Sequence, residues 1–197
     1  MTGCITTPRI DVDITKIIHN AKELKRLYGS KNVDILGVTK MVCGDPIIAD
    51  ALLQSGISIL ADSRISNIRK MRDAGIHAQF LLLRTPLPSQ IDDVVKYTDI
   101  SLNSEISVIE SLSKSALKYN VTHKVILMVE LGDLREGIMP DDLESVVKST
   151  LEMGGIELVG IGANLACHGG IKPGGWGRSS VYKLTGHSNL FNGIQFV

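Results

Sequence analysis

Residues 34–45, with the sequence DILGVTKMVCGD, form a short apolar run that stops at a lysine, Lys40. Ile35, Leu36 and Val38 are typical of a strand buried on both faces, as the strands of a parallel sheet are. A side chain at the carboxyl end of such a strand lies where α/β folds keep their reactive groups. A partly desolvated amine there can form a Schiff base with an aldehyde. The stretch therefore predicts a parallel α/β fold with a reactive lysine, or else a lysine that extends from a strand end into solvent.

The residues around this strand predict helices on both sides of it. After the strand, Asp45 can cap the first helical amides, and Pro46 suits the first position of a helix. Before the strand, Thr15 is the predicted N-cap of an amphipathic helix, and Gly29 lies just past the predicted end of this helix. Residues 9–14, RIDVDI, alternate apolar with polar side chains and predict a half-buried strand. The beginning of the chain thus predicts strand, helix, strand and helix in succession.

The same alternation continues along the chain. About six βα units, each of roughly 20–25 residues, follow the first strand. Predicted strands cover residues 57–61, 78–83, 99–102, 124–130 and 157–164, and predicted helices cover 46–55, 63–74, 89–96, 104–119 and 140–153. Such alternation indicates a parallel sheet with right-handed crossovers, either an open doubly wound sheet or a (β/α)8 barrel. The glycine-rich nucleotide signatures GxGxxG and GxxxxGK[ST] are absent, and periodicity does not choose between the two folds.

Composition narrows the class of protein. The 197 residues are 44% hydrophobic and 21% charged with a net charge of zero, which argues against nucleic acid as the main partner. No apolar run approaches the roughly 20 residues of a membrane helix, and the N-terminus lacks the features of a signal peptide. The three cysteines, Cys4, Cys43 and Cys167, are far apart and form neither a disulfide framework nor a CxxC metal pair. We therefore expect a cytoplasmic protein that acts without a membrane or a metal.

Four segments of the chain resemble the alanine racemase-like family, which consists of pyridoxal-phosphate enzymes of fold type III. Residues 10–20 (IDVDITKIIHN) resemble the opening strand and helix of that family, and residues 38–40 (VTK) resemble its cofactor-lysine strand. Residues 129–137 (VELGDLREG) resemble the segment with its active-site arginine, and residues 160–167 (GIGANLAC) resemble the following strand. The amino-acid sequence of these segments is most similar to the alanine/ornithine racemase branch, and the resemblance covers about residues 8–171. The resemblance implies the (β/α)8 barrel rather than the open sheet.

Carried over residue by residue, the resemblance implies three site residues. Lys40 is implied as the lysine that forms the cofactor aldimine and as one of two acid/base groups. Arg135 is implied beside the cofactor phenolic oxygen or the substrate carboxylate, although it also fits a surface arginine paired with Asp133 or Glu136. Asn164 stands where many relatives have a histidine stacked on the cofactor ring, although it also fits an asparagine that satisfies loop backbone.

The sequence also departs from the family pattern. Two parts of the family pattern are missing. They are the last two barrel units, which hold the cofactor phosphate in the family, and the C-terminal β-domain, which supplies a second catalytic base. Gly44 replaces a tyrosine that helps to hold phosphate in typical alanine racemases. Residues 172–197 are rich in Gly and Ser, lack helical periodicity and match no phosphate site. We therefore expect residues 1–171 to form an incomplete (β/α)8 barrel of α/β class, and residues 172–197 to be a divergent tail after a truncation or frameshift.

The resemblance implies a function and leaves alternatives open. It implies a pyridoxal 5′-phosphate-dependent racemase that interconverts L- and D-amino acids, with a small-molecule substrate and a homodimeric assembly, in an impaired form because parts are missing. Unpaired barrel edges would also favour aggregation or dimerisation. Alanine, ornithine, lysine and serine all remain open as substrates, with a tilt toward a basic amino acid. The alternatives are a non-catalytic pyridoxal-phosphate carrier of the single-barrel type and an aldolase for β-hydroxy amino acids, which would need metal ligands in the missing part.

Overall fold

The computed structural model describes residues 10–132, 136–164 and 195–196. Its centre is one parallel sheet of seven strands in the order β1-β2-β3-β4-β5-β6-β7. The strands are β1 (Gly37–Val38), β2 (Ile59–Asp62), β3 (Gln79–Leu82), β4 (Ile100–Asn103), β5 (His123–Val129), β6 (Ile156–Ala163) and β7 (Gln195–Phe196). Each strand pairs with the next one along the chain, whereas a doubly wound sheet reverses its strand order partway. The strand order therefore confirms the barrel-type fold, and β1 and β7 form the two edges of the described sheet.

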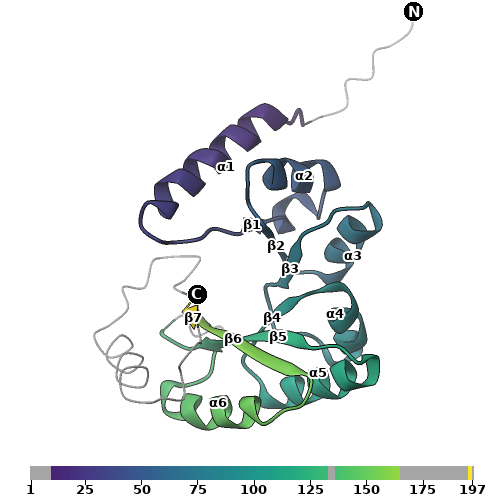
Figure 1. Ribbon diagram of the computed structural model, residues 1–197, viewed down its shortest axis with the longest axis vertical. Helices are drawn as coiled ribbons and strands as arrows, with labels where there is room; N and C mark the ends of the chain where they lie inside the picture. The colour runs from purple at the N-terminus through teal and green to yellow at the C-terminus, as the bar shows by residue number, and fades with distance from the viewer. Residues whose placement is uncertain (1–9, 133–135, 165–194, 197) are drawn as a thin grey trace, which may run out of the picture.

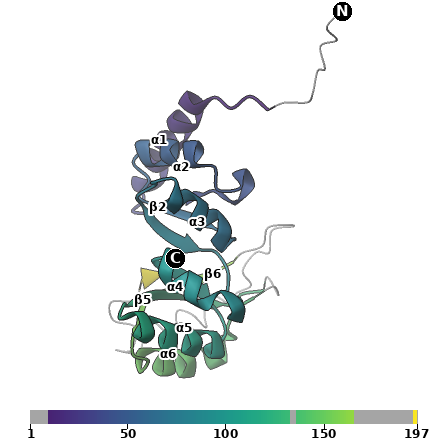
Figure 2. The ribbon, with the colours of Figure 1, turned by 90° about the vertical axis from the view of Figure 1, so that its right-hand side faces the viewer.

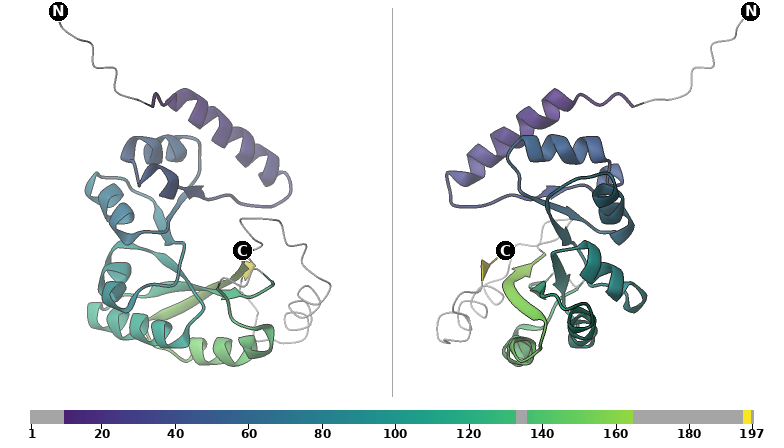
Figure 3. Two further views of the ribbon diagram at one scale, coloured as in Figure 1. Left: turned by 180° about the vertical axis from the view of Figure 1, so that it is seen from behind. Right: turned by 45° about the vertical axis from the view of Figure 1, so that its right-hand side comes forward.

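Helices cover one face of this sheet. They are α1 (Ile14–Gly29), α2 (Pro46–Gln54), α3 (Ile65–Asp73), α4 (Ile91–Tyr97), α5 (Ile106–Tyr119) and α6 (Leu143–Leu151). Helices α2 to α6 follow one another around the outside of the curving sheet (Figure 1), and a view from the side shows them stacked in chain order (Figure 2). Helix α1 lies beside α2 at one end of this row (Figure 3). The arrangement is that of a β/α barrel wall, with helices outside and strands inside.

The two faces of the sheet bury different sets of apolar side chains. On the helix side, strand residues such as Leu60, Phe80 and Val125 pack with side chains of α2 to α5. On the other side, a cluster formed only by strand and strand-end residues faces the barrel interior; its buried members are Ala61, Leu81, Ile100, Ile126 and Met128. Because both faces are buried, the strands read as continuous apolar runs rather than alternating ones. This is why the sequence pattern located β2 to β6.

The predicted strand over residues 9–14 is wrong in the part that is described. Residues 10–13 form no regular structure, and Ile10 is 89% exposed and Val12 49% exposed. No described strand lies beside this segment, so its alternating pattern has no neighbour with which to form a ladder. Helix α1 begins earlier than predicted, because Asp13 rather than Thr15 is its N-cap and accepts a hydrogen bond from the amide of Lys16. Gly29 is the last residue of α1, and Ser30 is the C-cap.

The last strand lies within residues 172–197, the segment predicted to be a divergent tail. Strand β7 pairs in parallel with β6, with Gly160 opposite Gln195 and Ile161 opposite Phe196. Residues 195–196 of this segment thus add a short strand to the described sheet. The predicted boundary at residue 171 lies outside the described residues, as do Cys4 and Cys167. Among the described helices, none is long and apolar enough to cross a membrane.

Candidate functional site

The parallel topology brings the polar residues that follow each strand to one edge of the sheet. Lys40 comes two residues after β1, Asp62 is the last residue of β2, and Asn164 directly follows β6. All neighbouring strands pair in parallel, so their carboxyl ends point the same way. In β/α barrels this edge carries the reactive groups. Two of the three residues singled out from the sequence, Lys40 and Asn164, thus lie on the edge where chemistry is expected.

Lys40 opens a single turn of 3-10 helix, η1 (Lys40–Val42), whose N-cap is Thr39. Its side chain is exposed and makes no ion pair within the described part of the chain. The partial desolvation expected from the sequence is therefore not provided by the described residues. The physical reason is position, because β1 is an edge strand with a neighbour on one side only. The backbone at Lys40, by contrast, is held in place by the hydrogen bonds of this turn.

Thr39, directly before the lysine, is held by the next strand. Its amide donates to the carbonyl of Ala61 at 2.9 Å, which continues the ladder between β1 and β2. Its hydroxyl donates to Asp62 Oδ2 at 2.8 Å, and the Ala61 carbonyl lies 3.3 Å from the same hydroxyl. Thr39 and Asp62 are both fully buried. The sequence reasoning did not single out either residue, although a carboxylate at the end of the apolar run ILAD was a signal.

The other oxygen of Asp62 holds the beginning of α3. Asp62 Oδ1 accepts from the amide of Arg64 at 2.9 Å and from Asn67 Nδ2 at 3.0 Å. Asn67 in turn packs directly under Gly44, where an added Cβ would lie 2.8 Å from the Asn67 backbone oxygen. Gly44 has φ +60, a conformation that side chains rarely adopt. The local backbone therefore has no room for the tyrosine that typical members of the resembled family carry at this position.

At the end of β6, Asn164 contacts the loop that follows β5. Its amide Nδ2 donates to Glu136 Oε1 at 3.0 Å. Arg135, the third predicted site residue, lies outside the described residues, and so does Asp133. The neighbouring Gly137 is packed against the backbone of Glu130, and a bridge joins Val129 to Ile138. The loop after β5 thus folds back over its own strand and reaches Asn164.

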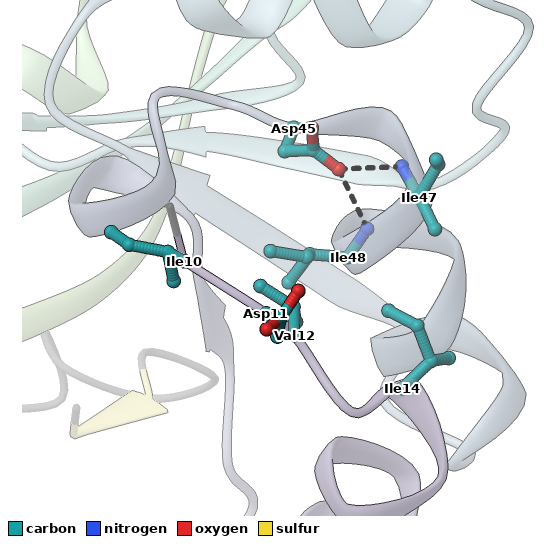
Figure 4. A pocket seen from close by; sticks show the side chains of 7 residues that line it. All are labelled: Ile10, Asp11, Val12, Ile14, Asp45, Ile47 and Ile48. Carbon is teal, nitrogen blue, oxygen red and sulfur yellow. Dashed lines mark hydrogen bonds between the residues drawn. The ribbon is translucent and has the colours of Figure 1, made fainter. Parts of the chain in front are cut away.

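A hollow lies to one side of this edge, at the start of α2. It has a volume of about 330 Å³ and is lined by Ile10, Asp11, Val12, Ile14, Asp45, Ile47 and Ile48 (Figure 4). The carboxylate of Asp45 faces the helix, because it accepts from the amides of Ile47 at 3.0 Å and Ile48 at 3.1 Å. The remaining lining is mostly apolar and does not include Lys40 or Asn164. We therefore do not assign the chemistry to this hollow.

The described side chains also bear on metal binding and redox chemistry. Within the described ranges, no group of three or more His, Cys, Asp or Glu side chains is arranged to hold a metal ion. Cys43 is exposed and free. The chemical groups that the edge offers are thus an amine, an amide and carboxylates.

Comparison with known proteins places this geometry in context. Residues 12–175 match the family described as alanine racemase, N-terminal domain. The chain is 40% identical over 167 residues to ornithine racemase of Acetoanaerobium sticklandii, covering 84% of this chain and 47% of the relative. It is 36% identical over 166 residues to lysine racemase of Thermotoga maritima, covering 84% of this chain and 46% of that protein. The chain thus spans about half the length of the curated relatives it matches.

The solved structures agree on the fold. An alanine racemase from Bacillus anthracis with bound L-Ala-P superposes with a TM-score of 0.75 at 20% sequence identity. The match covers 94% of this chain and 50% of that one. At this identity the likeness concerns the arrangement of strands and helices. The described sheet and its helices thus have the same arrangement as about half of that chain.

Proposed function

The chain belongs to the family of alanine racemase N-terminal domains, and we propose that it acts as a pyridoxal 5′-phosphate-dependent amino-acid racemase. The proposed reaction interconverts the L- and D-forms of a small amino acid. The observation that carries the proposal is the position of Lys40, an accessible amine at the carboxyl end of the first strand of a barrel-type sheet. A lysine at this edge is suited to covalent and acid/base chemistry on a carbonyl-bearing cofactor.

The residues at the edge fit the reactive end of this cofactor. When bound, pyridoxal 5′-phosphate supplies an aldehyde and an electron-accepting ring, which together make the α-proton of an amino acid acidic. Lys40 supplies the primary amine that an aldehyde requires, and its side chain is exposed and makes no ion pair with any described residue. We propose that Lys40 Nζ holds the cofactor and moves the proton on one face of the substrate Cα.

Two further residues complete the proposed site. We propose that Asn164 contacts the cofactor ring from the end of β6, with its amide oriented by the bond to Glu136. We propose that Arg135 binds an anionic oxygen of the cofactor or the substrate, because a guanidinium forms paired hydrogen bonds with such groups. Both residues follow strands that lie side by side in the sheet, β5 and β6. This neighbourhood supports a joint role at one site.

The proposed substrate is a basic amino acid. The support is the names of two relatives, ornithine racemase at 40% identity and lysine racemase at 36%, whereas an alanine racemase of Halothermothrix orenii is 30% identical. We further propose that residues 1–171 form the barrel domain and residues 172–197 a divergent tail, in a cytoplasmic homodimer. Racemization needs proton transfer on both faces of the substrate Cα, and Lys40 serves one face. We therefore propose that these 197 residues, assayed alone, bind the cofactor weakly and catalyse little or no racemization.

The test is a titration of the purified chain with pyridoxal 5′-phosphate, followed by absorbance and by mass spectrometry after borohydride reduction. We expect a Lys40-dependent absorbance band that is lost in Lys40→Ala and kept in Lys22→Ala, a matched change of an exposed lysine on α1. Modification spread evenly over exposed lysines would contradict the proposal. A Lys40-dependent band without formation of a D-amino acid would favour the non-catalytic carrier. This outcome would have to hold also for a chimera in which the chain replaces the matching half of a full-length relative.

A further inference from the structure

The buried hydrogen bond between Thr39 and Asp62 is more than a link between two strands. We infer that Thr39 and Asp62 are positioning residues for Lys40, an inference that rests on the proposed role of this lysine. Thr39 is the residue directly before Lys40 and the N-cap of the turn that Lys40 opens. Its hydroxyl lies 2.8 Å from Asp62 Oδ2, and both side chains are fully buried. The pair therefore acts on Lys40 through the backbone.

Thr39 is fixed at several points, which leaves little freedom for the backbone of its neighbour. Its amide donates to Ala61, and its carbonyl accepts from the amides of Val42 at 3.1 Å and Gly44 at 3.2 Å. The side-chain bond to Asp62 adds a constraint on the side of the helices. The exposed Lys40 side chain has no ion pair within the described residues to orient it. Its direction is consequently set by where Thr39 holds the start of the turn.

Asp62 accepts hydrogen bonds on both of its carboxylate oxygens. Within the described residues, the donors to Asp62 are the Thr39 hydroxyl, the Arg64 amide and Asn67 Nδ2, and all three are uncharged groups. A buried carboxylate without a cation is costly and is tolerated where it is fully hydrogen-bonded. Two acceptor oxygens let Asp62 accept a hydrogen bond from Thr39 on one side and hydrogen bonds from the start of α3 on the other. An asparagine has the same shape but would direct an NH₂ group at one of these two partners.

The same carboxylate couples the lysine turn to α3. Asn67, held by Asp62 Oδ1, supports the other end of the turn by packing under Gly44. The side chain of Lys70, one turn further along α3, donates to the carbonyl of Cys43 at 3.3 Å. The turn over residues 40–44 is thus clamped at its start by Thr39 and at its end by α3. Asp62 bonds both to Thr39 and to the start of α3.

The test compares variants that keep or remove the hydrogen bond between Thr39 and Asp62 with little change in side-chain size. Thr39→Val is isosteric and removes the donor, Thr39→Ser keeps the hydroxyl, and Asp62→Asn keeps the shape while removing the charge. The first readout is the fraction of Lys40 that pyridoxal 5′-phosphate modifies after borohydride reduction, measured by peptide mass spectrometry beside Lys22 in the same digest. The second readout is amide hydrogen exchange of residues 39–45 without cofactor. Circular dichroism reports folding of each variant.

We expect Thr39→Val and Asp62→Asn to lower the apparent affinity of Lys40 for the cofactor roughly tenfold, the factor that loss of one hydrogen bond to a charged group represents. Thr39→Ser should retain wild-type modification, and Lys22 should be unchanged throughout. Exchange of residues 39–45 should rise in Thr39→Val and in Asp62→Asn, but not in Thr39→Ser. Equal Lys40 modification in all folded variants would overturn the inference and leave the proposed function standing. Absence of Lys40 modification in the wild-type chain would instead overturn the proposed function, and the positioning role with it.

If Thr39→Val does not fold, Asp62→Asn and Thr39→Ser still decide between the two outcomes. A purely structural role for the pair would lower the stability of the variants and would affect Lys22 and Lys40 alike. A positioning role is selective for Lys40 and is rescued by the hydroxyl of serine. The ratio of Lys40 to Lys22 modification in the same sample separates these readings.

Discussion

Asn164 Nδ2 donates a hydrogen bond of 3.0 Å to Glu136 Oε1 and so joins the end of β6 to the loop after β5. Both side chains are partly buried. The donor is neutral and the acceptor is a carboxylate, which makes the bond stronger than one between two neutral groups. This hydrogen bond orders the part of the edge near β6, whereas Lys40 lies at the opposite part of the edge, near β1. The proposed site thus depends on contacts between segments that are far apart in the sequence.

We predict that Asn164→Asp destabilises the chain more at neutral than at acidic pH. The change replaces a donor with a second carboxylate beside Glu136, and like charges at this separation repel until one of them takes up a proton. We expect a loss of about 1 kcal/mol at pH 7, since the pair is only partly buried. Urea unfolding at pH 7 and at pH 4.5 measures the effect. Asn164→Ala is the control, because it removes the bond without repulsion; equal pH dependence of the two variants would contradict the prediction.

The sequence predicted the barrel wall well because that part of the fold is dictated locally. Helix α2 was expected over residues 46–55 with Asp45 as its cap and runs over Pro46–Gln54 with that cap. Strand β5 was expected over residues 124–130 and covers His123–Val129. The alternating segment 9–14 failed for the opposite reason, because a strand requires a neighbour and local pattern cannot supply one. Pattern therefore located elements with a buried face, and failed for a segment without a strand beside it.

The candidate site was only partly predictable. The position of Lys40 at a strand end follows from the apolar run before it. The bond from Thr39 to Asp62 does not, because it depends on the register that sets Val38 opposite Ala61. No local pattern fixes such a register across a complete helix. The buried hydrogen bond between Thr39 and Asp62 can therefore be recognised only from the pairing of the two strands.

We predict that Gly44→Ala costs more stability than Gly75→Ala. Both glycines have positive φ, at +60 and +81, so both changes carry the conformational penalty of about 1 kcal/mol for a side chain in this region. At Gly75 an added Cβ meets nothing within 4 Å, whereas at Gly44 it would lie 2.8 Å from Asn67. We expect a total loss of about 3 kcal/mol at Gly44, because overpacking adds to the penalty. Guanidinium unfolding compares the two, and equal losses would show that the contact with Asn67 is not tight.

We predict that Asp45→Ala destabilises α2 by about 1 kcal/mol, the usual contribution of an N-cap side chain. One carboxylate oxygen accepts from the amides of Ile47 and Ile48, and alanine would leave both amides without this partner. Asp45→Asn is the matched control, since it keeps an acceptor oxygen and should retain most of the stability. Urea unfolding gives the stability, and amide exchange of residues 47 and 48 locates the effect. A loss in Asp45→Asn as large as that in Asp45→Ala would indicate that charge, not capping, is the cause.

We predict that His123 makes the chain less stable as the pH falls from about 6.5 to about 4. Burial lowers the pKa of His123 from 6.5 to about 4, with Asp99 acting in the opposite direction, and the ring lies 2.9 Å from Ser101 Oγ. The folded chain therefore keeps this ring neutral at a pH where the unfolded chain binds a proton, so protonation favours unfolding. At about 1.4 kcal/mol per pH unit, the full effect is roughly 3 kcal/mol. Urea unfolding between pH 7 and pH 4 should show this slope in the wild-type chain and in His77→Gln, which changes an exposed histidine, and a shallower slope in His123→Gln. An unchanged slope in His123→Gln would mean that other groups cause the acid sensitivity.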